Sequence, residues 1–177
     1  MADQLYAGQD FEHDSSDYPS TRLLQRLRTI SGLIKSGFST PVYYAIQPGY
    51  DTHAAQLSTH SRLLRELGDA VKAFLDDMRA SRLADHVVVM AFSEFGRQVA
   101  ENASAGTDHG AAGPVFVAGD PIRGGLLGST AKLSDLKGRD LPMAIDFRSI
   151  YASLATGWLG AELPPEWLLV PKLDGLV

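Results

Sequence analysis

The feature that most constrains the fold is the run His-Val-Val-Val-Met-Ala-Phe at 86–92, which is apolar on both faces. A strand of this composition is typical of a parallel sheet that helices cover on both sides. Residues 42–46 are rich in β-branched and aromatic side chains, predict another strand, and end in a Gln-Pro-Gly breaker. A long helical pattern separates the two runs. A strand, a helix and a strand in this order predict a βαβ unit with a right-handed crossover.

Two amphipathic helices are predicted from apolar residues that recur every three or four positions. The first follows Pro19, takes Ser20 or Thr21 as its N-cap and ends near Gly37. The second runs from about residue 54 to residue 81. Its predicted apolar stripe consists of Leu57, Leu64, Leu67, Val71, Leu75 and Met78.

The remaining elements are shorter. Residues 114–118 predict a third strand, and the glycines within 122–128 predict an edge hairpin. Residues 129–145 have no regular pattern, and Asp146 is expected to cap a final helix that continues to Trp158. We therefore predict an irregular acidic lead-in over residues 1–19 and a single α/β domain over residues 20–177.

Composition limits the functional classes. The chain has 177 residues, of which 45% are hydrophobic, so one domain with a substantial core is expected. The net charge of -5 and the lack of a basic stripe argue against nucleic-acid binding. No apolar run reaches membrane-spanning length, and the start shows no signal peptide. Because the chain has no cysteine, any metal must be held by Asp, Glu or His.

Candidate metal ligands and catalytic residues follow the predicted strands. Asp51 and His53 come after the run at 42–46, and Glu94 and Arg97 come after the run at 86–92. The third cluster is Asp108 and His109, which lie between Gly106 and Gly110 in a loop over residues 98–113. Since functional groups collect beyond the carboxyl ends of parallel strands, we expect the three clusters to meet. Carboxylates with imidazoles favour Zn²⁺, Mn²⁺ or Fe²⁺ over Ca²⁺.

Structural roles compete with these functional ones. Asp51 or Thr52 could cap the long helix, and Asp108 could bond backbone amides within its loop. Glu94 could be a metal ligand, a general base or the ion-pair partner of Arg97, and Arg97 could bind an anionic substrate oxygen. A Ser93–His109 hydrolase triad is disfavoured because no glycine precedes the serine as a nucleophile elbow requires. His60 is expected to be a core histidine, and Asp146 and Arg148 a cap and a surface group.

Four motifs together resemble one family. They are Gly-Tyr-Asp-Thr-His at 49–53, Ser-Glu-Phe-Gly-Arg at 93–97, Gly-Thr-Asp-His-Gly at 106–110 and Asp-Phe-Arg-Ser-Ile-Tyr at 146–151. In this order they look like the C-terminal part of the bacterial "domain of unknown function 1501" proteins, which are similar to the sulfatase/alkaline-phosphatase superfamily. The resemblance implies a three-layer α/β/α fold with a mostly parallel, alkaline-phosphatase-like sheet. It also implies a two-metal site that hydrolyses phosphate or sulfate esters.

Within this resemblance, Asp108 and His109 match the Asp-His pair that ligates one ion, and Asp51 and His53 are the counterparts for the other. Zn²⁺ is the expected metal, with Mn²⁺, Fe²⁺ or Ca²⁺ as alternatives. The substrate would be a small anionic ester or a sulfated or phosphorylated saccharide. Full-length relatives look longer and exported, so the parent protein is expected in the periplasm or outside the cell.

The chain departs from the superfamily pattern in two respects. It has no early strand that would supply a Ser or Thr nucleophile, and no His follows His109. The chain thus resembles a fold that lacks its N-terminal part. Such a metal-binding portion is expected to be inactive alone. Its uncovered sheet edge could pair two copies of the chain. The alternatives are a non-catalytic binding or scaffold domain with a vestigial metal site, and a structural domain whose polar loops only cap helices.

Overall fold

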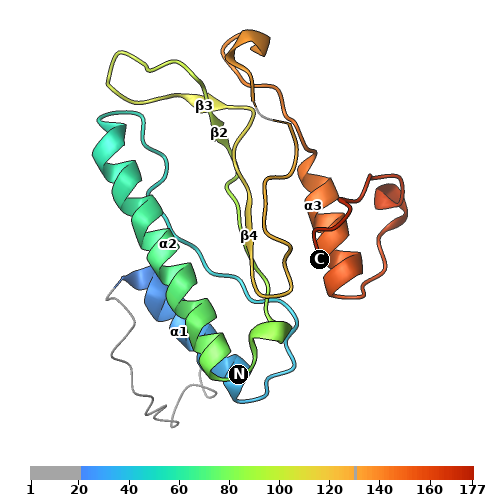
Figure 1. Cartoon of the computed structure of the whole chain (residues 1–177). Helices are drawn as coiled ribbons and strands as arrows, with labels where there is room; N and C mark the ends of the chain where they lie inside the picture. The colour runs from blue at the N-terminus through green and yellow to red at the C-terminus, as the bar shows by residue number, and fades with distance from the viewer. Residues whose placement is uncertain (1–20, 130) are drawn as a thin grey trace, which may run out of the picture.

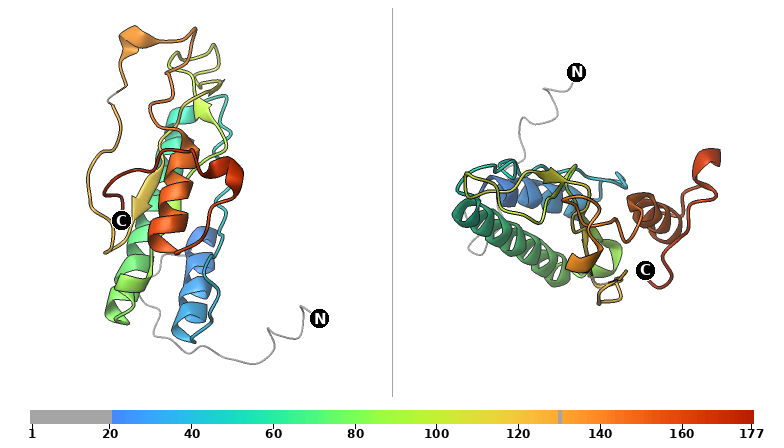
Figure 2. Two further views of the ribbon diagram at one scale, coloured as in Figure 1. Left: turned by 90° about the vertical axis from the view of Figure 1, so that its right-hand side faces the viewer. Right: turned by 90° about the horizontal axis from the view of Figure 1, so that it is seen from above.

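The computed structural model describes residues 21–129 and 131–177, so the predicted lead-in over 1–19 lies outside the described residues. Helices α1 (Arg22–Lys35) and α2 (Gln56–Ala80) lie side by side. Short strands run along them, and helix α3 (Phe147–Ser153) lies beyond strand β4 (Phe116–Ala118), on the side away from α2 (Figures 1 and 2). No helix among the described residues is long and apolar enough to cross a membrane.

Helix α1 begins and ends where its sequence predicts. The Thr21 hydroxyl accepts a hydrogen bond from the backbone N–H of Leu24, which is an N-cap contact. At the other end, Gly37 has a φ of 77°, which favours glycine. The N–H of Phe38 donates to the carbonyl of Leu33 and that of Gly37 to Ile34, at 3.2 and 3.0 Å. This pair of bonds is the Schellman motif that satisfies the last carbonyls of a helix.

Helix α2 confirms the predicted long helix but begins differently. Its N-cap is Ala55, which has a left-handed φ of 44° and offers no side-chain cap. The expectation that Asp51 or Thr52 would cap this helix is therefore wrong. Instead, the N–H groups of Ala55 and Gln56 donate to the carbonyls of Ser104 and Ala105, both at 2.9 Å. A distant loop thus supplies the hydrogen-bond acceptors that a helix start requires.

The core lies between α1 and α2. Leu24 and Met78 are fully buried in it, and Ser31 of α1 hydrogen-bonds Asp77 of α2 beside the ion pair between Lys35 and Asp77. The buried cluster consists of Leu23, Leu24, Leu27, Ala70, Phe74, Leu75, Met78 and Val87. Because α2 has 25 residues and α1 has 14, the first turns of α2 extend past this contact.

The predicted stripe of α2 is correct only in its second half. Leu57 is 83% exposed and Leu64 is 46% exposed, whereas Leu63 is buried. The reason is that α1 does not cover these first turns. The segment before α2 covers Leu63 instead, since Gly49 lies against its side chain and Tyr50 donates to its carbonyl.

Within residues 21–129 and 131–177 the strands form no parallel sheet. Strand β1 (Val89–Ala91) pairs with β4 antiparallel, with Met90 opposite Val117. Strands β2 (Gly96–Arg97) and β3 (His109–Gly110) form a second antiparallel pair. The three-layer α/β/α fold with a mostly parallel, alkaline-phosphatase-like sheet is therefore wrong: in the part of the chain that the structure describes, three α-helices accompany two sheets of two strands each. The predicted βαβ unit is wrong for the same reason.

The apolar run at 86–92 is covered only in part, since Val87 is buried whereas Phe92 is 45% exposed. Val87 and Val89 pack on the helical core, while Phe92 meets Tyr151 of α3 edge-on with ring centroids 5.8 Å apart. A run apolar on both faces is thus satisfied by a short antiparallel ribbon between helices. Residues 42–46 are not a strand, although Ala45 packs on the core, and Val42, Tyr44 and Ile46 are exposed.

The C-terminal third partly matches its prediction. The Asp146 carboxylate accepts from the N–H of Arg148 at 2.9 Å, which confirms the cap of α3, and it also pairs with the Arg148 guanidinium. The α-helix ends at Ser153 and a π-helical turn, Leu154–Trp158, completes the predicted span. Short 3₁₀ turns occur at Ala84–His86, Leu133–Asp135 and Pro165–Trp167. The predicted edge hairpin at 122–128 is wrong, since these residues form turns and irregular chain.

A core substitution tests this packing. We expect Met78→Ala to lower the free energy of unfolding by about 2–5 kcal/mol, because Met78 is fully buried and its removal leaves a cavity. Urea unfolding followed by circular dichroism measures the change. Leu57→Ala is the control: its 83% exposed side chain predicts a change within about 0.5 kcal/mol. Equal losses in the two variants would contradict the observed position of the core.

Candidate metal centre

The β2–β3 hairpin places His109, and glycines allow its close backbone contacts. A Cβ on Gly96 would lie 1.8 Å from the carbonyl oxygen of Ala112, and one on Gly110 would lie 2.5 Å from the carbonyl carbon of Arg97. Both distances are far below van der Waals contact, so these positions require glycine. His109 pairs with Arg97 across the hairpin.

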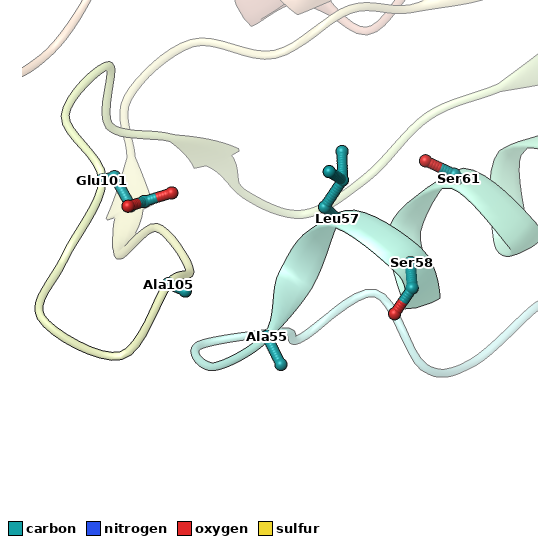
Figure 3. A pocket seen from close by; sticks show the side chains of 6 residues that line it. All are labelled: Ala55, Leu57, Ser58, Ser61, Glu101 and Ala105. Carbon is teal, nitrogen blue, oxygen red and sulfur yellow. The ribbon is translucent and has the colours of Figure 1, made fainter.

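The loop between β2 and β3 folds back onto the start of α2. Figure 3 shows Ala105 on this loop near Ala55 at the first turn of the helix. Gly106 packs directly on the chain before α2, where an added Cβ would lie 2.4 Å from the carbonyl carbon of His53. The shallow pocket of Figure 3 is lined by Leu57, Ser58, Ser61, Glu101 and the two alanines, and not by the candidate ligands.

Asp51, His53 and His109 converge as a result. The Asp51 Oδ1 atom lies 2.9 Å from Nε2 of His53 and 2.7 Å from Nε2 of His109. The two Nε2 atoms are 3.3 Å apart. Ligand atoms of all three residues fall within 4.8 Å of one another, so this group could hold a metal ion. The side chains are 66% exposed for Asp51 and 46% exposed for each histidine, which leaves the group open to solvent.

Asp108 lies outside this group of three and contacts His53 through the ring nitrogen that does not face Asp51 and His109. Its Oδ1 atom is 3.4 Å from Nδ1 of His53, on the opposite side of the ring from Nε2. The same oxygen accepts a hydrogen bond from the Asn102 side chain at 3.1 Å. A carboxylate on the second nitrogen of a ligating histidine fixes the ring orientation in many metal sites.

The local hydrogen bonds favour the charged carboxylates. The bond from His109 is the largest influence that holds the pKa of Asp51 below its ordinary value. For Asp108, the bond from Asn102 contributes most to a lowered pKa, followed by the bond from His53. Both groups are therefore carboxylates at neutral pH, the form that binds a metal ion.

Two further residues hold the histidine and the loops. The Phe95 ring stacks on the His109 ring with centroids 3.9 Å apart and planes 9° apart. The Arg97 guanidinium donates to the carbonyl of Thr107 at 2.5 Å and also to the carbonyl of Tyr50. These carbonyls directly precede Asp108 and Asp51, so Arg97 joins the two segments that carry the acidic groups.

The other predicted site residues do not enter the cluster. Glu94 is exposed and makes no hydrogen bond or ion pair with any residue that the structure describes, so the alternative in which it pairs with Arg97 is not observed. Ser93 is also exposed and makes no hydrogen bond to His109 within the described chain. His60 is half-buried, where it lies 3.3 Å from the amide of Gln56 and edge-on to Tyr50. Of the three predicted clusters, two meet through their acidic and imidazole groups, and the third contributes Arg97, which bonds the backbone carbonyls of both other segments.

Comparison with protein families matched residues 32–159 to "Protein of unknown function (DUF1501)". This chain belongs to that family. The match spans most of the chain and includes all four motifs of the predicted resemblance. Comparison with curated proteins found no match, and comparison with solved structures found none either. The resemblance to a DUF1501 protein is thus confirmed, while a relation to sulfatases and alkaline phosphatases stays a prediction.

Asn102 and Phe95 adjoin the candidate ligands but are not predicted as site residues from the sequence. Asn102 is the first residue of an Asn-Ala-Ser-Ala-Gly segment, a composition that predicts an Asx turn, and its Oδ1 accepts from the N–H groups of Ser104 and Gly106. That signal predicts a turn but not the contact with Asp108. Phe95 carries no local signal at all for stacking on a residue of the next strand.

Gly106 offers a test of how the loop is seated. We expect Gly106→Ala to lower the free energy of unfolding by about 1–3 kcal/mol, because the methyl group must push apart two packed backbone segments. Gly68→Ala is the matched control, since nothing lies within 4 Å of its added Cβ and alanine favours the helix by about 0.5–1 kcal/mol. Urea unfolding measures both. A neutral or stabilising effect of Gly106→Ala would refute the close packing of Gly106 on the backbone at His53.

Proposed function

We propose that this DUF1501 chain binds a divalent cation, with Zn²⁺ favoured, through Asp51, His53 and His109. The observation that carries the proposal is the convergence of three ligand atoms from two segments that are 56 residues apart between the histidines. Two imidazoles and one carboxylate are a donor set that suits Zn²⁺ better than Ca²⁺. Asp108 completes the set by holding the far nitrogen of His53.

The same arrangement supports a hydrolytic role. Three protein ligands leave a further coordination position, which is typical of catalytic rather than structural zinc sites. The exposure of the three side chains gives a substrate access to that position. A bound divalent cation would supply Lewis acidity to the ester. We therefore propose the metal-binding portion of a hydrolase that acts on phosphate or sulfate esters.

One observation favours the alternative, a binding or scaffold domain that carries a metal without turnover. The hydroxyls adjacent in sequence to the acidic residues bond elsewhere: Thr52 bonds the carbonyl of Tyr50, and Thr107 bonds Gln56. Neither hydroxyl makes a hydrogen bond to the side chains of Asp51, His53 or His109 in the described chain. Attack would then require a water molecule or a nucleophile from outside the described chain.

Metal binding is tested by thermal unfolding of chelator-treated, dialysed protein. We expect Zn²⁺ at about 100 times its dissociation constant to stabilise the native state by about 2.7 kcal/mol and so raise Tm. His109→Ala should abolish the rise because it removes one of the three ligands. His86→Ala is the control, since this exposed histidine lies outside the cluster. An unchanged Tm for the wild type with Zn²⁺, Mn²⁺ and Fe²⁺ would refute the proposal.

Turnover separates the two roles of a metal-binding chain. If the chain is hydrolytic, the Zn²⁺-loaded protein should release nitrophenol from an aryl phosphate or an aryl sulfate, and Asp51→Ala should remove that activity. Glu94→Gln and Arg97→Lys, measured alongside, test the predicted catalytic roles of those residues. Metal binding without release of nitrophenol is expected of a scaffold and also of a hydrolase portion that is inactive alone, so the same assay on a longer protein that contains this chain separates the two roles.

A further inference from the structure

We propose that Asn102 is a positioning residue of the candidate metal centre, which fixes Asp108 and, through it, the ring of His53. This inference rests on the proposed metal binding but concerns a residue outside the ligand set. Asn102 lies in the β2–β3 loop, six positions before Asp108 and 49 positions after His53.

The side chain of Asn102 uses every hydrogen bond it can make. Its Nδ2 group donates to the carbonyl of His53 at 3.0 Å and to Oδ1 of Asp108 at 3.1 Å. Its Oδ1 atom accepts from the N–H of Ser104 at 2.9 Å and from the N–H of Gly106 at 3.1 Å. An amide offers two donors and two acceptor positions, so no capacity remains.

The Oδ1 and Nδ2 atoms of this amide bond different parts of the site. The oxygen closes the turn at 102–106, whose carbonyls cap α2. The nitrogen reaches out of the turn and bonds both the backbone of His53 and the carboxylate behind its ring. One planar group therefore sets the distance between the loop, the segment before α2 and Asp108.

Orientation of Asp108 matters because its Oδ1 atom is shared. That oxygen contacts both Asn102 and Nδ1 of His53. Without the amide, the half-exposed carboxylate could rotate into water, and the His53 ring would lose the contact that turns Nε2 toward Asp51 and His109. Removal of such outer partners typically weakens metal binding 10–100-fold.

Two substitutions of Asn102 separate the role of its Oδ1 acceptor from the role of its Nδ2 donors. Asn102→Asp keeps an acceptor for the amides of Ser104 and Gly106 but removes the donors to Asp108 and His53. Asn102→Ala removes both ends. Ser104→Ala is the matched control in the same turn, because Ser104 contributes only backbone groups to the contacts described here.

The first measurement is affinity for Zn²⁺ by competition with a chromophoric chelator, with Co²⁺ absorption as a report on ligand geometry. We expect both Asn102 variants to bind Zn²⁺ about 10–100-fold more weakly and to alter the Co²⁺ spectrum, and Ser104→Ala to match the wild type. A wild-type Co²⁺ spectrum in Asn102→Asp would overturn the proposal, because a purely structural turn residue predicts that result.

A double-mutant cycle tests whether Asn102 acts through Asp108. We expect Asn102→Ala to reduce Zn²⁺ affinity far less in an Asp108→Ala background than in the wild type. Fully additive effects would show that the two residues act independently, which contradicts the proposed route.

The last measurement needs no metal, so it separates this inference from the proposed function. In the nuclear magnetic resonance spectrum of metal-free protein, we expect the Asn102 side-chain amide protons to exchange slowly and one of them to shift in Asp108→Ala. If the wild type binds no cation but shows this behaviour, the metal proposal fails while the hydrogen bond from Asn102 to Asp108 is confirmed. If the amide protons do not respond to Asp108→Ala, the positioning role is wrong whatever the metal result.

Discussion

The candidate centre depends on the contact between the β2–β3 loop and the start of α2. The carbonyls of Ser104 and Ala105 receive the first amides of a helix that has no side-chain cap, and Gly106 lies flat against the chain at His53. Orphan amides at a helix start must find acceptors, so this docking answers a local need of α2. It also brings the segment that carries Asp108 and His109 next to the segment that carries Asp51 and His53. Helix capping and site assembly are therefore one interaction.

The sequence predicted more of the site than of the fold. Asp51, His53, Asp108 and His109 were expected to meet at the edge of a parallel sheet, and they meet where a hairpin loop docks on a helix. The convergence was predicted from polar clusters that follow apolar runs and from the family resemblance, and it holds although the parallel strands assumed for it do not form. The sheet could not be predicted correctly, because a run that is apolar on both faces does not indicate whether its partner strand is parallel or antiparallel. Val87 and Val89 pack on the helical core and Phe92 meets Tyr151, but the ladder partner of this run is the antiparallel β4.

The site contacts that could not be predicted from the sequence are long-range polar ones. Arg97 reads as an anion-binding group, yet its guanidinium joins the carbonyls of Tyr50 and Thr107. Asn102 reads as a turn residue, yet its amide reaches 49 positions back to His53. In both cases the residue type fits several partners equally well, and only the tertiary arrangement selects one. Leu57 shows the same limit for apolar residues, since helical periodicity places it on the apolar stripe and the short α1 leaves it uncovered.

The electrostatics of the cluster explain why a cation suits it. One carboxylate oxygen of Asp51 faces two imidazole nitrogens that are themselves 3.3 Å apart, so protons on both nitrogens would crowd at a single point. One divalent cation at that point would take the place of both protons and use the same three atoms as ligands. Asp108 and Asp51 keep two negative charges beside it in a chain whose net charge is already -5. Since the buried cluster between α1 and α2 begins beyond the first turns of α2, gain or loss of this cation would act on the loop contact first and on the apolar core only through the helix.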